Sequence, residues 1–145
     1  MPIRCEIVSQ DRLVFQGEAD MVILPGMGGE MGILPRHAPV LTTLKFGVVR
    51  VRRAGSDQLF AVAGGVAEVQ PDLVTVLADA AENVEEIDVK RAELARQRAQ
   101  EALTKGVPAG SDAMLSIEAA LRRSNLRLDV VRRYRKTQPP FPGRQ

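Results

Sequence analysis

The sequence predicts an α+β protein, in which an N-terminal antiparallel β-sandwich is followed by a C-terminal antiparallel helical hairpin. In the first part, short apolar segments recur at close spacing between Gly, Pro and Asp turns. In the second part, apolar residues recur every three or four positions. The net charge also changes sign between the two parts. Residues 1–86 carry seven basic and twelve acidic side chains, whereas residues 87–145 carry thirteen basic and six acidic side chains. We therefore predict a sandwich domain at 1–86, a hairpin domain at 87–136 and a disordered tail at 137–145.

The predicted strands are short and closely spaced. Ile3, Cys5 and Ile7 alternate with Arg4 and Glu6, as expected for a strand with one buried face. The other predicted strands cover residues 13–15, 21–24, 40–44, 48–53, 59–63, 66–70 and 73–78. Eight or nine short strands with frequent turns favour a sandwich or a barrel, although they do not give the strand order.

Two helices are predicted after the strands. Asp88 can cap the first helix, which is expected to end near Lys105 because Gly106 stops it. The second helix is expected to begin near Asp112. The inward residues are Ala92, Ala95, Ala99, Ala102 and Leu103 on the first helix and Met114, Ile117, Leu121, Leu128 and Val131 on the second. Because an alanine stripe buries little apolar area, we expect the hairpin to be the less stable half of the protein.

Composition excludes several classes of protein. Clean apolar runs such as Met21–Leu24 are far too short to span a membrane. The N-terminus reaches a charge at Arg4 and lacks the apolar segment of a secretory signal, so we expect no signal peptide and no transmembrane segment. The single cysteine, Cys5, excludes an internal disulfide and a multi-cysteine zinc site, and we expect no metal site.

Candidate catalytic residues are few. Cys5 and His37 could form a nucleophile and its base, but Cys5 lies in the apolar-facing register of its strand and no third group orients the pair. A core cysteine and a turn histidine are therefore favoured. The glycines at residues 26–29 lack the Lys, the Ser or Thr, and the helix that complete a phosphate-binding loop. The sequence thus predicts no catalytic residues and a protein that is not an enzyme.

Residues 28–39 read Gly-Gly-Glu-Met-Gly-Ile-Leu-Pro-Arg-His-Ala-Pro, and their glycines and prolines indicate a shaped turn. This pattern resembles the epsilon subunit of the F-type ATP synthase of bacteria and chloroplasts. Two further segments, Ala-Gly-Gly-Val-Ala-Glu-Val at 63–69 and Ile-Asp-Val-Lys-Arg-Ala at 87–92, match the same family in the same order. The resemblance covers residues 3 to about 130 and is lost in the C-terminal extension.

The resemblance implies a non-catalytic rotor subunit of the central stalk of a proton-translocating ATP synthase. Such a subunit couples the membrane ring of c subunits, through the gamma subunit, to ATP synthesis, and it inhibits ATP hydrolysis through its C-terminal hairpin. The alpha and beta subunits are implied as partners of the second helix. The implied location is the cytoplasmic face of the cell membrane, with membrane contact only through the complex. Since the two domains have opposite charge, we expect the hairpin to populate a folded-down and an extended arrangement.

The resemblance also implies contact and ligand sites. Glu30 and His37 are expected at the end of the sandwich that faces the membrane ring and the gamma subunit. No cofactor is required, but ATP with Mg²⁺ is a candidate regulatory ligand. The implied nucleotide-binding residues are Glu82, Asp88, Arg91, Arg123 and Arg127. Arginines can fork onto phosphate oxygens and a carboxylate can accept from the adenine amino group or the ribose, although Asp88 has a competing role as helix N-cap.

The basic run at residues 122–136 has seven basic side chains offset only by Asp129. It is typical of a solvated face, of an arm that inserts among acidic protein surfaces, or of nucleic-acid binding. Because only Tyr134 is available for stacking on bases, the residues do not favour nucleic acid. A free-standing cytosolic adaptor or nucleic-acid-binding protein that uses this helix is the alternative function.

Overall fold

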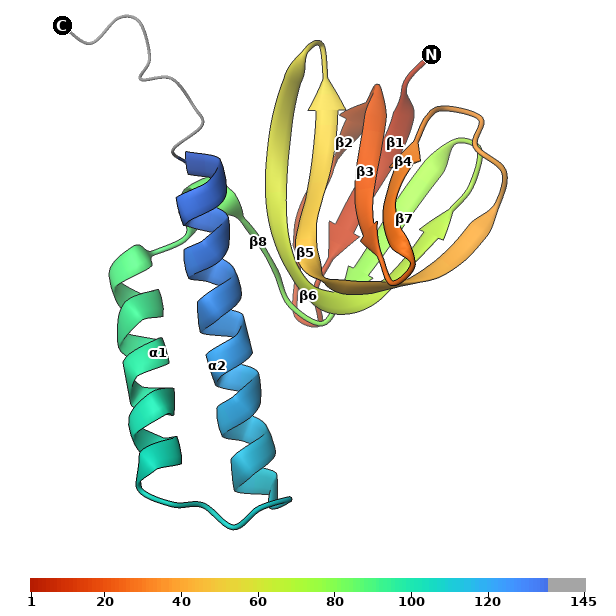
Figure 1. The fold of residues 1–145 in the computed structure, drawn as a ribbon. Coiled ribbons are helices and arrows are strands. Elements are labelled where there is room, and N and C mark those ends of the chain that lie inside the picture. The colour runs from red at the N-terminus through yellow and green to blue at the C-terminus, as the bar shows by residue number, and fades with distance from the viewer. Residues whose placement is uncertain (136–145) are drawn as a thin grey trace, which may run out of the picture. The chain divides into compact units, whose positions relative to one another are not determined.

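The computed structural model describes residues 1–135 and divides the chain into two compact units, Met1–Asn83 and the residues from Val84 onward (Figure 1). This boundary precedes the predicted one after Glu86, because the 3₁₀ turn η1 (Val84–Glu86) belongs to the helical unit. The predicted disordered tail at 137–145 lies outside the described residues. No helix within residues 1–135 is long and apolar enough to cross a membrane.

The first unit is one eight-stranded sheet that folds over into a sandwich. Its strands are β1 (Ile3–Val8), β2 (Leu13–Ala19), β3 (Met21–Gly26), β4 (Gly29–Ile33), β5 (Val40–Arg53), β6 (Ser56–Val69), β7 (Leu73–Ala78) and β8 (Ala81–Asn83). Their order is β2-β1-β7-β6-β5-β3-β4, and β8 pairs with β6. All of these pairs are antiparallel except β1 with β7, which is parallel. The predicted sandwich is therefore confirmed, with one parallel pair in it.

The sandwich core is mainly aliphatic. Alternate residues of β1 are fully buried, and they include Cys5. Burial is the main cause that raises the pKa of the Cys5 thiol to about 12, so this thiol stays neutral and unreactive at physiological pH. The prediction of a core cysteine is confirmed. Phe60 is the largest fully buried side chain, and its ring centroid lies 5.1 Å from that of Phe15.

Strands β5 and β6 differ from the prediction, because each is one continuous strand of 14 residues instead of two short ones. The two strands keep a single register from Val40 opposite Val69 to Arg53 opposite Ser56. Their two-residue turn, Ala54-Gly55, has φ values of 50° and 80°, which match the right-handed twist of a hairpin. The sequence prediction also missed β4, which lies in the segment read as a shaped turn, and β8, a short strand in a segment with no predicted element.

Gly64 and Gly65 explain why β6 continues where the sequence suggested a break. Both have positive φ, 84° and 118°, and a Cβ on Gly65 would collide with the carbonyl oxygen of Leu77 on β7. Glycine therefore permits close approach of two strand backbones instead of ending the strand.

Replacing Gly65 with alanine is expected to destabilise the sandwich by about 3 kcal/mol, because the clash is with backbone atoms and φ is strained. Urea denaturation of the full chain measures the change. Gly28→Ala is the matched control, since a Cβ there has no neighbour within 4 Å. Equal stability of the two variants would contradict this account of Gly65.

The second unit is the predicted antiparallel hairpin of two helices, α1 (Val89–Thr104) and α2 (Asp112–Val130). Asp88 and Ser111 cap them, each accepting a backbone hydrogen bond with its side chain. A single turn of π-helix, η2 (Val131–Arg135), continues α2. Both predicted helix starts and the stop before Gly106, where φ is 82°, are confirmed.

Candidate functional site

The loop between β4 and β5 holds the predicted contact residue His37 in a fixed shape. Arg36 has a φ of 68°, which is uncommon outside glycine, and its backbone N–H donates to the carbonyl of Pro71 at 2.8 Å. The backbone N–H of His37 donates to the carbonyl of Leu34 at 3.2 Å. The His37 Nδ1 lies 2.7 Å from the Ala38 carbonyl oxygen, which requires the proton on Nδ1 and leaves Nε2 available to a partner.

The structure separates the two predicted contact residues. Glu30 lies beside the tight turn between β3 and β4, opposite Pro25. His37 lies beyond the other end of β4, so that residues 31–33 of the strand and residues 34–36 of the loop separate it from Glu30. The Glu30 side chain is exposed, whereas His37 is half-buried. The two residues therefore lie toward opposite ends of β4.

A groove next to the His37 loop was not predicted. It has a volume of about 580 Å³. Its lining residues are 39–41, at the start of β5, and 68–71, at the end of β6 and in the turn that follows. Leu41 on its wall is 74% exposed, the largest exposed fraction of any large hydrophobic residue between residues 2 and 134. A single leucine in a strand does not indicate an exposed site in the sequence, because only the tertiary structure shows which strand residues other elements leave uncovered.

Four of the five predicted nucleotide-binding residues lie on the hairpin. Asp88 and Arg91 open α1, and Arg123 and Arg127 lie in the second half of α2. The Asp88 Oδ1 accepts from the backbone N–H of Arg91 at 3.2 Å, so its predicted role as N-cap is confirmed. Glu82 lies on β8 in the sandwich unit, opposite Ala61.

Helix geometry divides the hairpin surface into two flanks on either side of the buried residues Ala92, Ala99 and Ser124. At 100° per residue, Arg91 and Arg98 share one flank of α1, and Arg123 and Arg127 lie on the same side of α2. We call these four arginines the basic flank. Sequence analysis did not single out Arg98, although its spacing of seven residues from Arg91 was a usable signal.

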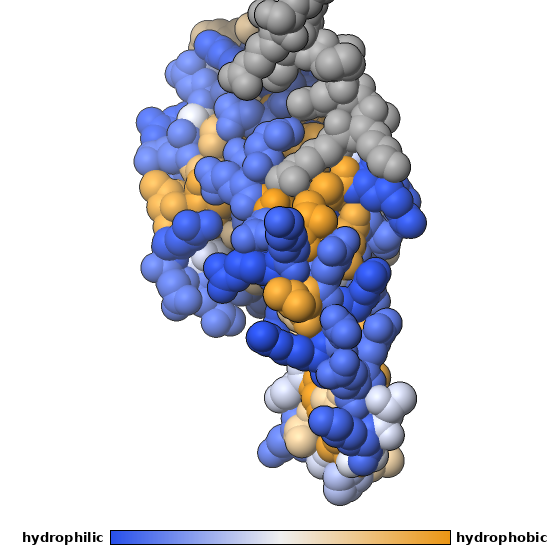
Figure 2. Space-filling view, turned by 90° about the vertical axis from the view of Figure 1, so that its left-hand side faces the viewer, coloured by the Kyte–Doolittle hydropathy of each residue, from blue (hydrophilic) through white to orange (hydrophobic). Residues whose placement is uncertain are grey.

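The surface in Figure 2 is mostly hydrophilic, with separate hydrophobic patches.

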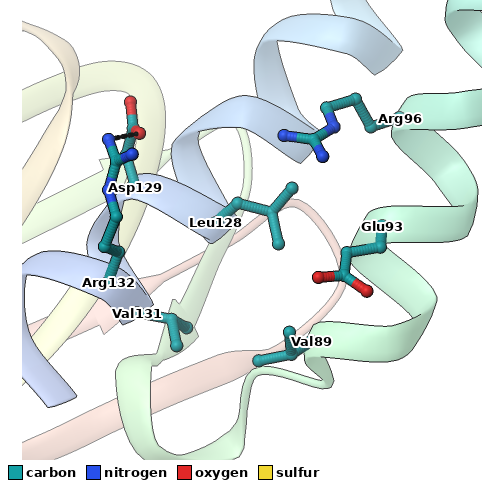
Figure 3. Close-up of a pocket in the computed structure, with 7 residues that line it drawn as sticks. All are labelled: Val89, Glu93, Arg96, Leu128, Asp129, Val131 and Arg132. Carbon is teal, nitrogen blue, oxygen red and sulfur yellow. Dashed lines mark hydrogen bonds and ion pairs between the residues drawn. The ribbon is translucent and has the colours of Figure 1, made fainter. Parts of the chain in front are cut away.

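The opposite flank carries a cavity with charges of both signs, shown in Figure 3. The cavity has a volume of about 250 Å³ and lies between α1 and the end of α2. Its lining residues are Val89, Glu93, Arg96, Leu128, Asp129, Val131 and Arg132. Asp129 and Arg132 form an ion pair at 2.7 Å. Within residues 1–135, no group of His, Cys, Asp or Glu is arranged to hold a metal ion.

Comparison with known families covers both units. The model described as "ATP synthase, Delta/Epsilon chain, beta-sandwich domain" matches residues 2–84. The model described as "ATP synthase, Delta/Epsilon chain, long alpha-helix domain" matches residues 85–132. The chain belongs to the ATP synthase delta/epsilon chain family. The resemblance seen in three short motifs is thereby confirmed across the sandwich and the hairpin.

Relatives in this family are similar over nearly their whole length. The ATP synthase epsilon chain of Herpetosiphon aurantiacus is 43% identical over 138 residues, covering 95% of this chain and 100% of the relative. The ATP synthase epsilon chain of Moorella thermoacetica is 47% identical over 130 residues, covering 89% and 96%. This chain is accordingly an epsilon-type subunit of ATP synthase, and the alternative of a free-standing adaptor or nucleic-acid-binding protein is not supported.

A solved structure shares the fold. A chain in the Euglena gracilis mitochondrial ATP synthase, in a structure described as OSCP/F1/c-ring, superposes with a TM-score of 0.63 at 20% identity. The match covers 93% of this chain and 80% of that one. At this identity the likeness concerns the fold, namely a strand-rich unit followed by two helices.

Proposed function

We propose that this epsilon-type chain is a non-catalytic rotor subunit, which couples the membrane ring of c subunits through gamma to ATP synthesis. The observation that carries the proposal is the match of both units, in order, to the two delta/epsilon domain models over residues 2–132. The chemistry of the chain agrees with a non-catalytic role. Cys5 is buried as a neutral thiol, and His37 uses Nδ1 on its own loop.

We assign the contacts of the sandwich to two places instead of one. Glu30, at the turn between β3 and β4, is the candidate contact for the membrane ring. His37 and Leu41, at the far end of β4 and on the neighbouring groove, are candidates for the gamma subunit. Leu41 is an apolar side chain that water contacts over 74% of its surface, and a partner that covered it would gain free energy.

Glu30→Ala and His37→Ala are expected to leave the isolated protein folded, because Glu30 is exposed, His37 is half-buried in a loop, and neither belongs to the core. Each should reduce co-purification with the ATP synthase when the tagged chain is pulled down from native membranes. Because the two residues lie at opposite ends of β4, their effects should add in the double variant. A loss of most thermal stability in either variant would mean that the residue is structural.

The hairpin is the proposed inhibitory element. Its second helix and the π-turn carry a dense group of arginines, which suits insertion among the acidic surfaces of alpha and beta subunits. We propose that the hairpin restrains ATP hydrolysis in one arrangement and releases it in another.

The basic flank is the proposed site for regulatory ATP with Mg²⁺. Its four guanidinium groups come from facing helices and can fork onto phosphate oxygens. Arg91 and Arg98 are seven residues apart, about 10 Å at helical rise, which suits a ligand with several phosphate groups. Since one oxygen of Asp88 is engaged as N-cap, only its second oxygen is available to accept from the nucleoside.

Recovery of ATP synthase subunits with the tagged full-length chain from native membranes tests the rotor proposal directly. Gamma and the c ring should be recovered together with the chain in detergent. Their absence from a preparation in which the chain is intact would overturn the rotor assignment.

A further inference from the structure

The contact between α1 and α2 follows a strict seven-residue repeat. The repeat positions are Val89, Ala92, Arg96, Ala99 and Leu103 on α1, and Met114, Ile117, Leu121, Ser124, Leu128 and Val131 on α2 and the start of η2. Spacing of alternately three and four residues is the pattern by which two helices pack along a common seam. All of these residues are buried or half-buried.

Two positions of the repeat are polar, Arg96 on α1 and Ser124 on α2. Ser124 is buried, and its hydroxyl donates to the Ala120 carbonyl of its own helix at 2.8 Å. Arg96 is half-buried and makes no hydrogen bond or ion pair within the part of the chain that the structure describes. Every other position of the seam is apolar.

The seam is incompletely filled beside Arg96. Figure 3 shows Arg96 and Glu93 extending from α1 toward α2, with Leu128 reaching back between them. Glu93 is three residues before Arg96, within range for a helical ion pair, yet the two side chains do not pair. The adjoining cavity of about 250 Å³ offers room for several water molecules at about 30 Å³ each, so the guanidinium can stay hydrated.

A charged side chain at one core position of such a repeat lowers the stability of helix association, because apolar contact is lost where the charge keeps its water. Here the cost is not offset by a partner for the charge. The remaining core residues on α1 include two alanines, which bury little area. The hairpin therefore lacks a strong apolar layer in the middle of its contact.

We propose that Arg96 is a built-in weak layer of the hairpin, which keeps α1 and α2 only marginally associated and is the place where they begin to separate. Arg96 thus regulates the equilibrium between a closed and an opened hairpin. This claim concerns the chain itself. Its consequence for ATP hydrolysis rests on the proposed inhibitory function of the hairpin.

The test replaces Arg96 with leucine or methionine in the full-length protein and measures amide hydrogen exchange in α1 and α2. We expect exchange to slow by at least about tenfold in both variants, because the seam becomes apolar at every position of α1. Lys90→Leu is the matched control, since Lys90 is exposed on the same helix, lies off the seam and is outside the basic flank. It should change exchange by less than about twofold. Unchanged or faster exchange in both Arg96 variants would overturn the proposal.

A second measurement separates this inference from the proposed function. In the reconstituted ATP synthase, Arg96→Leu should raise ATP hydrolysis, because a hairpin held closed inhibits less. Slower exchange with unchanged hydrolysis would keep Arg96 as the weak layer and contradict the hairpin as a brake. Unchanged exchange with altered hydrolysis would overturn the weak layer and leave the brake intact.

Discussion

Removal of residues 87–145 is expected to raise ATP hydrolysis by the assembled enzyme at least about fivefold, the lower end of common coupling effects. The deletion removes both helices and every arginine of the proposed arm. The sandwich should still fold and assemble, because residues 1–83 form a compact unit with their own buried core. Hydrolysis is measured on complexes whose subunit content has been confirmed by gel electrophoresis.

The control for the deletion is a chain that keeps the hairpin but carries Gly28→Ala, a change with open space around the new methyl group. It should hydrolyse ATP at the wild-type rate. An unchanged rate with the shortened chain, when that chain is present in the complex, would show that the hairpin does not inhibit.

Arg91→Ala and Arg123→Ala are each expected to weaken ATP binding by about 10- to 100-fold, since a hydrogen bond to a charged group contributes about 1.5–3 kcal/mol. Titration calorimetry of the purified chain with ATP and Mg²⁺ measures the affinity. Arg98→Ala should behave in the same way, because Arg98 lies on the same flank by helix geometry.

The matched control is Arg132→Ala, because Arg132 lies on the opposite flank and is engaged by Asp129 at 2.7 Å. Its ATP affinity should equal that of the wild type. Absence of heat at millimolar ATP in the wild-type chain, or equal affinity in all variants, would remove the nucleotide site. Since a ligand stabilises the form that it binds, bound ATP should also raise the melting temperature of the wild-type chain.

The sequence alone determined the features that depend on neighbouring residues. The Asp88 side chain accepts a hydrogen bond from a backbone N–H in the first turn of α1 that has no partner within the helix. Gly106 takes a left-handed φ just after the last turn, so both limits of α1 were predictable from neighbouring residues. The change from a two-residue to a three- or four-residue apolar period identified the order of strands and then helices. Three short motifs carried the family resemblance, because turn geometry needs particular residues at particular positions.

Only the tertiary structure decided the features that join distant parts of the chain. Gly64 and Gly65 read as a break, but close approach of β7 makes them the interior of one long strand. The parallel pairing of β1 with β7 joins segments about 70 residues apart, and no local pattern specifies such a partner. Glu30 and His37 are seven residues apart in sequence but lie toward opposite ends of β4, because residues 31–33 between them belong to a strand and not to one continuous turn. Arg96 is one arginine among many until the packing of α1 on α2 places it in the seam, since burial depends on the partner helix and not on the residue itself.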